Sequence, residues 1–169
     1  MQIYATAPLL IPEPLSSSRT LHLVDVENLA GGPSVEPWLA RAICASYEVV
    51  APTGYGDHII VATSHFAAPV AWFAWPPEAR RLVRSGVDGA DWALLEVLER
   101  ENVAARFAHV VIGSGDGIFA MAAARLQSAG CAVTVVARRR ALSRQLRLAV
   151  RDVRYLDVPP ARVVALRAA

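Results

Sequence analysis

Three aspartates occur in segments whose residue types suit metal chemistry. Asp25 lies near the end of the apolar run LHLVDV, Asp91 lies in the segment DGADWALL, and Asp116 lies in the glycine-rich segment GSGDG. Hard cations such as Mg²⁺ prefer oxygen ligands and keep several water molecules. Small and flexible neighbours leave room for those waters, so the three aspartates are candidate metal ligands.

Each aspartate also has an ordinary structural interpretation. Asp25 can be a polar residue that closes a strand, Asp116 can be a turn or helix-capping residue, and Asp91 can be an acid that suits the positive end of a helix dipole. Three unrelated reasons would then be needed to place all three at one edge of a fold. The combination therefore favours a common site, provided that the surrounding elements bring the segments together.

Strands and helices alternate along the chain, and this alternation is what could position the acids. Short apolar, β-rich runs predict strands, and longer segments with apolar residues at helical spacing predict helices. Residues 66–75 are ambiguous between a short helix and an irregular apolar segment, and Pro76-Pro77 ends them either way. We expect strands at 21–26, 58–63, 80–84, 109–112, 132–137 and 153–156, and helices at 36–50, 89–101, 118–129 and 141–150.

This order of elements predicts a three-layer α/β/α sandwich with a central, mostly parallel sheet and right-handed crossovers. In such open sheets, ligands bind beyond the carboxyl ends of the strands. Asp25 lies near the end of the first expected strand, Asp116 follows the fourth, and Asp91 lies at the start of a helix. A shared site at the carboxyl edge is therefore the expectation to test.

The length of 169 residues suits one domain with its own core. Hydrophobic residues make up 54% of the chain and charged residues 19%, which excludes a disordered protein. We expect an irregular arm at 1–19, rich in Pro and Ser, a folded domain at 20–158 and a tail at 159–169. No apolar segment reaches the roughly 20 uninterrupted residues of a membrane-spanning helix, so no membrane association is expected.

The N-terminal arm lacks the basic start and the long apolar stretch of a secretory signal. Cys44 and Cys131 lie in apolar surroundings without the spacing of a zinc site, which indicates reduced core residues. Both observations predict a cytoplasmic protein.

Basic residues are unevenly distributed although the net charge is only +2, and all of them are arginines. Arg140, Arg144, Arg147 and Arg151 recur at steps of four and three residues, so they share one face of the expected helix at 141–150. A solvated face of an amphipathic helix explains this pattern. A track for the phosphates of a nucleic acid explains it as well.

The glycine-rich segment around Asp116 invites comparison with the dinucleotide fingerprint GxGxxG. The comparison fails, because Ile118 occupies the third glycine position. An aspartate in the turn would also repel a pyrophosphate unless a cation intervened, which favours a metal site.

Other side chains have weaker claims to function. Trp72, Phe73 and Trp75 could stack on bases, although packing in the core is the interpretation we favour. His22 and His65 do not stand in a ligand-like arrangement, and no Ser-His-Asp or Cys-His arrangement is visible.

The segments VDVENL, GADWALLEVL and VVIGSGDGIFAMAAARLQSAGCAVTVVA resemble the NYN domain of the PIN-like ribonuclease superfamily, with the same order of motifs over roughly residues 21–156. The resemblance implies a Mg²⁺- or Mn²⁺-dependent endoribonuclease that acts on RNA. It further implies that Asp25, Asp91 and Asp116 hold the metal and that Asn28 helps to order the first loop.

Two positions depart from the family pattern. The family usually has SGDGDF, whereas Ile118 replaces the second acid here, and Asp88 replaces a lysine often found shortly before the middle aspartate. A single ion is then favoured over two, with Asp88, Ser114 and Glu96 as secondary candidates. A non-catalytic RNA-binding module and a phosphatase of similar layering are the alternative functions, and a homo-oligomer is compatible with any of the three.

Overall fold

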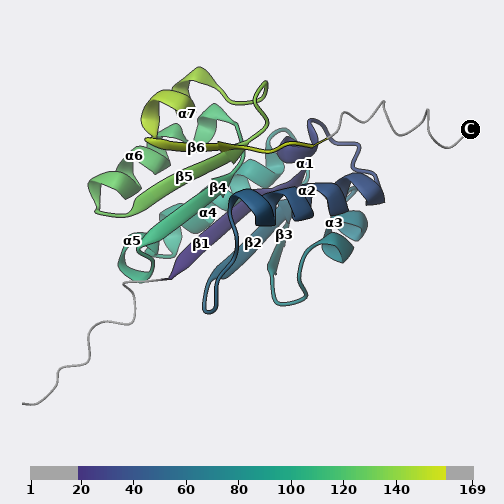
Figure 1. The fold of residues 1–169 in the computed structure, drawn as a ribbon, viewed down its shortest axis with the longest axis horizontal. Coiled ribbons are helices and arrows are strands. Elements are labelled where there is room, and N and C mark those ends of the chain that lie inside the picture. Colours follow the sequence, from purple (N-terminus) through teal and green to yellow (C-terminus); the bar gives the residue numbers. More distant parts are fainter. Residues whose placement is uncertain (1–18, 159–169) are drawn as a thin grey trace, which may run out of the picture.

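Six short strands supply the central layer of the protein, whose structure is a computed structural model that describes residues 19–158. All five strand pairs are parallel, and the strands lie in the order β3-β2-β1-β4-β5-β6 (Figure 1). The expected three-layer α/β fold with a parallel sheet is confirmed. The strands are β1 (Thr20–Asp25), β2 (His58–Thr63), β3 (Arg80–Val83), β4 (His109–Gly113), β5 (Ala132–Ala137) and β6 (Asp152–Tyr155).

Helices cover both faces of the sheet because alternate residues of each strand point to opposite faces. Leu21 and Leu23 of β1 pack with α4, α5, α6 and α7 in one core cluster, and Val24 packs with α1, α2 and α3 in the other. The helices are α1 (Val26–Ala30), α2 (Pro37–Val50), α3 (Ala68–Ala74), α4 (Gly89–Arg100), α5 (Val103–Arg106), the 3₁₀ turn η2 (Gly117–Phe119), α6 (Ala120–Ser128) and α7 (Arg144–Ala149).

Most elements lie where the sequence predicts them. Three short helices add to the prediction or resolve it. The segment after β1 is not a loop but the short helix α1, because the Asp25 carboxylate accepts a hydrogen bond from the Asn28 backbone and caps that helix. Residues 68–74 form a helix, α3, which resolves the ambiguity at 66–75. The short helix α5 has no counterpart in the prediction.

The predicted helix at 141–150 is wrong in its extent. Ser143 is the N-cap of α7 and accepts a hydrogen bond from the Leu146 backbone, so the helix begins at Arg144 and ends at Ala149. Arg140 therefore precedes the helix and Arg151 follows it. The four arginines do not share one helix face, and of them only Arg144 and Arg147 lie on α7.

The aromatic residues around α3 divide between core and surface. Trp75 is buried and packs edge-on against Tyr47, with 5.3 Å between ring centroids. Phe73 is 91% exposed and Trp72 is 37% exposed. Core packing is thus confirmed for Trp75 and wrong for Phe73 and Trp72.

The predicted arm at 1–19, apart from Arg19, and the predicted tail at 159–169 lie outside the described residues. Both cysteines are free, with Cys131 buried and Cys44 partly exposed. Within residues 19–158, no helix combines the length and the apolar character that crossing a bilayer requires.

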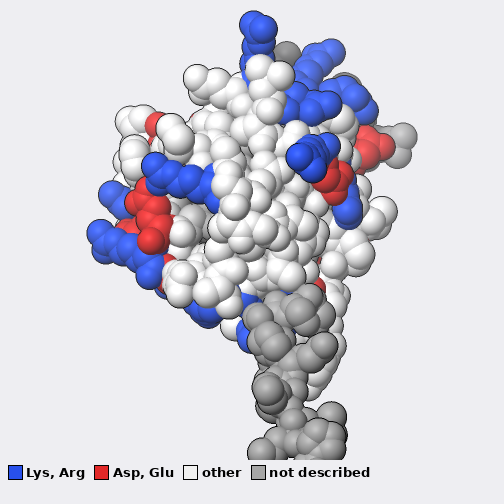
Figure 2. Space-filling view, turned by 90° about the vertical axis from the view of Figure 1, so that its left-hand side faces the viewer, with Lys and Arg blue, Asp and Glu red and all other residues white. Residues whose placement is uncertain are grey.

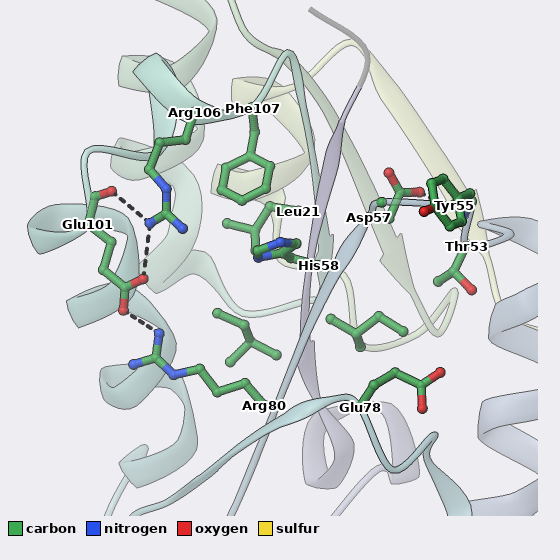
Figure 3. Close-up of a pocket in the computed structure, with 14 residues that line it drawn as sticks. Leu21, Thr53, Tyr55, Asp57, His58, Glu78, Arg80, Glu101, Arg106 and Phe107 are labelled. Atoms are coloured by element: carbon green, nitrogen blue, oxygen red, sulfur yellow. Dashed lines mark hydrogen bonds and ion pairs between the residues drawn. The ribbon is translucent and has the colours of Figure 1, made fainter. Parts of the chain in front are cut away.

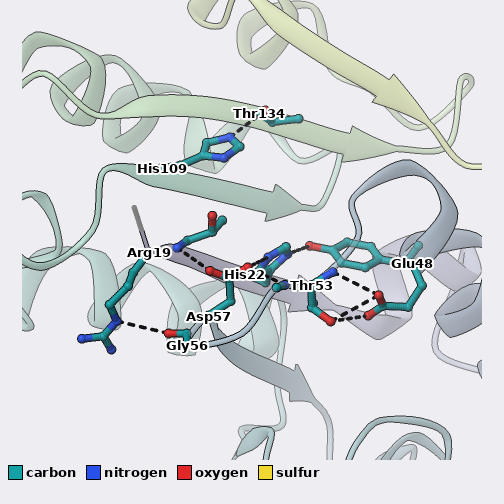
Figure 4. Close-up of polar contacts among 11 residues, drawn as sticks. Arg19, His22, Glu48, Thr53, Gly56, Asp57, His109 and Thr134 are labelled. Carbon is teal, nitrogen blue, oxygen red and sulfur yellow. Dashed lines mark hydrogen bonds and ion pairs between the residues drawn. The ribbon is translucent and has the colours of Figure 1, made fainter. Parts of the chain in front are cut away.

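A buried polar network joins the amino end of β1 to α2 (Figure 4). His22 is 1% exposed, its Nδ1 lies 3.0 Å from the Tyr47 hydroxyl, and its Nε2 lies 3.7 Å from a carboxylate oxygen of Asp57. The other oxygen of Asp57 accepts a hydrogen bond from the Thr20 backbone at 2.7 Å. Burial lowers the pKa of His22, and the nearby Asp57 only partly opposes this effect.

The burial of His22 predicts a loss of stability in acid. The unfolded chain binds a proton at this histidine below about pH 6.5, whereas the folded protein resists it, so the free energy of unfolding falls as the pH decreases through that value. Between pH 8 and pH 5, the free energy of unfolding of His22→Leu should fall by about 1 kcal/mol less than that of wild type, as measured by urea unfolding. The exposed His65, changed to Leu, is the control. An equal drop in both variants would contradict this account.

Candidate metal centre

The sheet order reverses between its two central strands, β1 and β4. The chain leaves β1 toward α1 and α2 on one face, and leaves β4 toward η2 and α6 on the other. Such a reversal opens a crevice at the carboxyl edge of an open α/β sheet. Asp25 is the last residue of β1, and Asp116 follows β4 by three residues, so both lie at this crevice.

The first wall of the crevice is built by α1. Asp25 is 3% exposed, and its Oδ1 accepts the Asn28 N–H at 3.0 Å. The Asn28 side-chain oxygen in turn accepts the Gly115 N–H at 2.9 Å. Asn28 therefore links the segment after β1 directly to the glycine turn after β4.

The second wall is the glycine turn itself. The Asp116 carboxylate accepts the Ile118 N–H at 2.9 Å and so caps η2. The Asp116 N–H donates to the hydroxyl of the fully buried Ser114 at 3.2 Å. Ser114 in turn donates to Asp91 at 3.4 Å, so the turn is connected to the start of α4.

The third wall is the first turn of α4. Asp91 lies in this turn and is 5% exposed. Asp88, the N-cap residue, adopts a left-handed backbone conformation with φ 53° and is exposed. One carboxylate oxygen each from Asp88, Asp91 and Asp116 lies within 4.8 Å of the others. Two distant segments of the chain thus bring these carboxylates together, and Asp25 from a third segment is hydrogen-bonded to Asp91.

Electrostatic repulsion and burial perturb the carboxyl groups at the centre of this cluster. Burial, followed by the charge of Asp25 and a hydrogen bond to it, raises the pKa of Asp91 to about 8. Burial also raises the pKa of Asp25, although its hydrogen bonds to Asn28 and Asp91 oppose the rise. One proton shared by Asp25 and Asp91 at neutral pH is the consequence.

The acids surround a pocket of about 470 Å³ at the carboxyl edge. Two charged side chains that the sequence analysis did not single out also line it, those of Glu27 and Arg84. Glu27 accepts hydrogen bonds from the Ser64 N–H at 3.0 Å and the Ser64 hydroxyl at 2.7 Å, and so joins α1 to the end of β2. Its position between Asp25 and Asn28 was the available signal.

Two residues discussed as ligands or lost ligands lie away from this pocket. Glu96 does not line it, and its carboxylate is 44% exposed and pairs with Arg100 and, at 3.7 Å, with Arg84. Ile118 packs, partly buried, against the core cluster that contains Phe119. Of the secondary candidates, Asp88 and Ser114 therefore adjoin the acidic cluster and Glu96 does not.

The arginine-rich segment, residues 138–151, approaches the pocket at its N-terminal end. Ala141 lines the pocket, and the Ser143 N–H donates to the Gly115 carbonyl at 2.8 Å. The Arg138 guanidinium donates to the Ala30 carbonyl at the end of α1. Arg140, which follows β5, thus belongs to the carboxyl edge.

The later arginines lead away from the carboxyl edge. Because all strands are parallel, Arg151, which directly precedes β6, lies at the opposite, amino edge, where it lines a separate pocket with His109. Figure 2 views the molecule from the amino side, with basic side chains gathered at the top, where Figure 1 places α7 and β6. The arginine series therefore runs from one edge of the sheet to the other.

A pocket of about 500 Å³ at the amino edge differs in its electrostatics (Figure 3). Glu101 there pairs with both Arg80 and Arg106, and these contacts lower the pKa of its carboxyl group. Its carboxylate is thus stabilised in the charged form. In the acidic pocket, by contrast, burial and neighbouring carboxyl groups raise the pKa of Asp91. Perturbed pKa values of this kind are typical of functional sites.

Comparison with known proteins supports the fold and leaves the activity open. No family model and no curated protein matches the chain. A crystal structure of a protein of unknown function from Vibrio parahaemolyticus superposes with a TM-score of 0.54, at 17% sequence identity, over 86% of this chain and 96% of that one. At this identity the likeness extends to the fold alone.

The raised pKa of Asp91, next to Asp25, predicts that Asp91 destabilises the metal-free protein at alkaline pH. The folded protein keeps a proton on Asp91 up to about pH 8, whereas the unfolded chain loses it near pH 3.8, so stability falls as the pH rises between these values. We expect Asp91→Asn to remove roughly 2–4 kcal/mol of this loss. Urea unfolding in EDTA at pH 5 and pH 8 measures it, and identical pH dependence in wild type and variant would rule out the coupling.

The contact between the glycine turn and the arginine-rich segment predicts a steric effect. A Cβ atom on Gly115 would lie 2.4 Å from the Ala141 carbonyl oxygen, which is backbone and cannot rotate away. Gly115→Ala should therefore cost about 2 kcal/mol in urea unfolding. At Gly117 the nearest atom is the mobile Gln145 Oε1, at 2.9 Å, so Gly117→Ala should cost less than half as much. Equal costs would count against the packing described.

Proposed function

We propose that this protein is a metal-dependent endoribonuclease, which hydrolyses phosphodiester bonds of RNA with Mg²⁺ or Mn²⁺ held in the acidic pocket. The observation that carries the proposal is the convergence of Asp25, Asp91 and Asp116 from three separate segments, with two of these acids buried and hydrogen-bonded to each other. The resemblance of the three segments to the NYN domain supports the RNA substrate.

The residues of the pocket fit a hard divalent cation. Carboxylate oxygens are the ligands that Mg²⁺ and Mn²⁺ prefer, and the described lining residues include neither histidine nor cysteine. A cation would also relieve the repulsion that raises the pKa of Asp91. Asp91, Asp116 and Asp88 would hold the ion. Asp25 would support Asp91 through the hydrogen bond between their carboxyl groups.

Asp88 bears on the two departures from the family pattern. Its carboxylate lies within 4.8 Å of those of Asp91 and Asp116, whereas the side chain at position 118 packs against the core. Asp88 would therefore provide the third oxygen ligand for one ion. This arrangement favours a single ion and keeps the proposal compatible with Ile118.

The chain's own residues would prepare the site for hydrolysis. A bound cation supplies polarisation of a phosphate oxygen and acidification of a coordinated water. Ser114 orients Asp91 by donating to it, and Asn28 holds Gly115 and thereby the turn that carries Asp116. Asp91 would release its proton when the cation binds, since the charged carboxylate is the ligand.

The basic segment would attract the polyanion. Arg139 and Arg140 are exposed next to Ala141 at the pocket, and Arg144 and Arg147 are exposed on α7. RNA bound along this series would reach the acidic pocket at one end. Binding would weaken steeply with salt, because each phosphate contact releases counterions.

The proposal predicts RNA cleavage that depends on Mn²⁺ or Mg²⁺ and on Asp116. Asp116→Asn removes a charged oxygen ligand and should lower the cleavage rate of a labelled RNA by about 100-fold or more. Glu99→Gln, a change at an exposed acid of the same helix as Asp91, is the control and should cleave like wild type.

The same incubation separates the alternative functions. Salt-sensitive RNA binding without metal-stimulated cleavage would identify a non-catalytic binding module. Release of inorganic phosphate from small phosphoesters, with RNA left intact, would identify a phosphatase. Unchanged cleavage in Asp116→Asn would remove the proposed mechanism.

A further inference from the structure

One basic side chain, that of Arg84, lines the acidic pocket within residues 19–158. The other described residues of the lining include five acids and no further cation. A phosphate that enters this pocket meets repulsion from the acids that the cation does not neutralise. A fixed positive charge at the rim is what such a substrate needs.

The backbone of Arg84 is fixed next to the first turn of α4. The Arg84 N–H donates to the Thr63 carbonyl at 3.1 Å and so continues the pairing of β3 with β2. The Arg84 carbonyl lies so close to Gly89 that a Cβ atom there would approach it to 2.3 Å. Arg84 is therefore held beside the helix turn that carries Asp91.

The guanidinium of Arg84 is available for a ligand. Its side chain is 52% exposed, and its nearest ion-pair contact, with Glu96, is 3.7 Å long. Within residues 19–158 no hydrogen bond from this guanidinium is present. Arg84 also lines the neighbouring pocket that contains Glu96. Because Glu96 makes a closer ion pair with Arg100, Arg84 can exchange its long contact with Glu96 for a ligand in the acidic pocket.

We propose that Arg84 binds a phosphate group of the RNA substrate at the rim of the acidic pocket, opposite the cation. A guanidinium presents a planar fork of donors that can hold two phosphate oxygens at once. The phosphate would then lie between two positive groups, the cation inside the acidic cluster and the guanidinium at the rim. This inference rests on the proposed ribonuclease function and assigns one of its substrate contacts.

Steady-state cleavage of a short RNA with Mn²⁺ tests this assignment in the full chain. Arg84→Gln should raise KM roughly 10-fold to 100-fold, the range expected for loss of a charge-assisted hydrogen bond, and should affect kcat less. Arg84→Lys keeps the charge without the fork, so its KM should lie between those of wild type and Arg84→Gln. The slope of log affinity against log salt should fall by about 0.7 in Arg84→Gln.

Arg100→Gln is the matched control, because Arg100 also pairs with Glu96 but does not line the pocket. It should leave KM within about twofold of wild type. Calorimetric Mn²⁺ binding should be unchanged or tighter in Arg84→Gln, since the variant removes a positive charge near the cation. Urea midpoints of all variants should match that of wild type, because the altered side chains are half exposed or more.

The outcomes separate the assignment from the function on which it rests. If Arg84→Gln behaves like Arg100→Gln while cleavage still requires Mn²⁺ and Asp116, Arg84 is not the phosphate contact and the ribonuclease proposal stands. If wild type shows no metal-dependent cleavage, the proposed function fails and the assignment fails with it. A selective rise of KM in the Arg84 variants supports both.

Discussion

The close approach of Asp25 and Asp91 is the interaction on which the character of the site depends. Two carboxyl groups, each almost completely buried, share a hydrogen bond where β1 ends and α4 begins. Burial of like charges opposes folding, and the same effect raises the pKa of Asp91. A fold tolerates such a pair when the surrounding structure holds it in place, and pairs of this kind concentrate at functional sites.

Gly115 is the position through which that surrounding structure is assembled. Its N–H donates to Asn28, its carbonyl accepts from Ser143, and the absence of a side chain lets Ala141 approach closely. One residue thus connects the segment after β1, the turn after β4 and the segment after β5. The acidic cluster and the arginine-rich segment are joined here, so the proposed metal site and the proposed surface for RNA would act on the same substrate.

The acidic side chains at the two edges of the sheet have different partners. At the amino edge, Asp57 accepts backbone hydrogen bonds from Thr20 and Gly54, and Glu101 pairs with two arginines. The two arginines lower the pKa of the Glu101 carboxyl group. The hydrogen bonds of Asp57 tie the start of β1 to the segment that precedes β2. At the carboxyl edge Asp91 lacks a basic partner in the described part of the chain, so a ligand of positive charge is the natural complement. This difference, rather than the size of either pocket, directs the functional assignment.

The sequence by itself determined the class of fold and the candidate acids. Apolar runs such as HIIVAT and AVTVVA predicted strands that the structure has at the same residues, because buried parallel strands are continuous apolar segments. The position of Asp25 at the end of one strand and that of Asp116 shortly after another followed from the same pattern.

Only the tertiary structure decided which acids meet and which arginines stay near them. The strand order places β1 beside β4, which brings residues about 90 positions apart in the chain into one crevice. Local periodicity could not show that Ser143 caps α7, that Arg151 lies at the opposite edge from Arg140, or that Arg84 and Glu27 line the pocket. These features depend on contacts between distant segments, and a one-dimensional pattern holds no information about the side chain that will lie across a crevice.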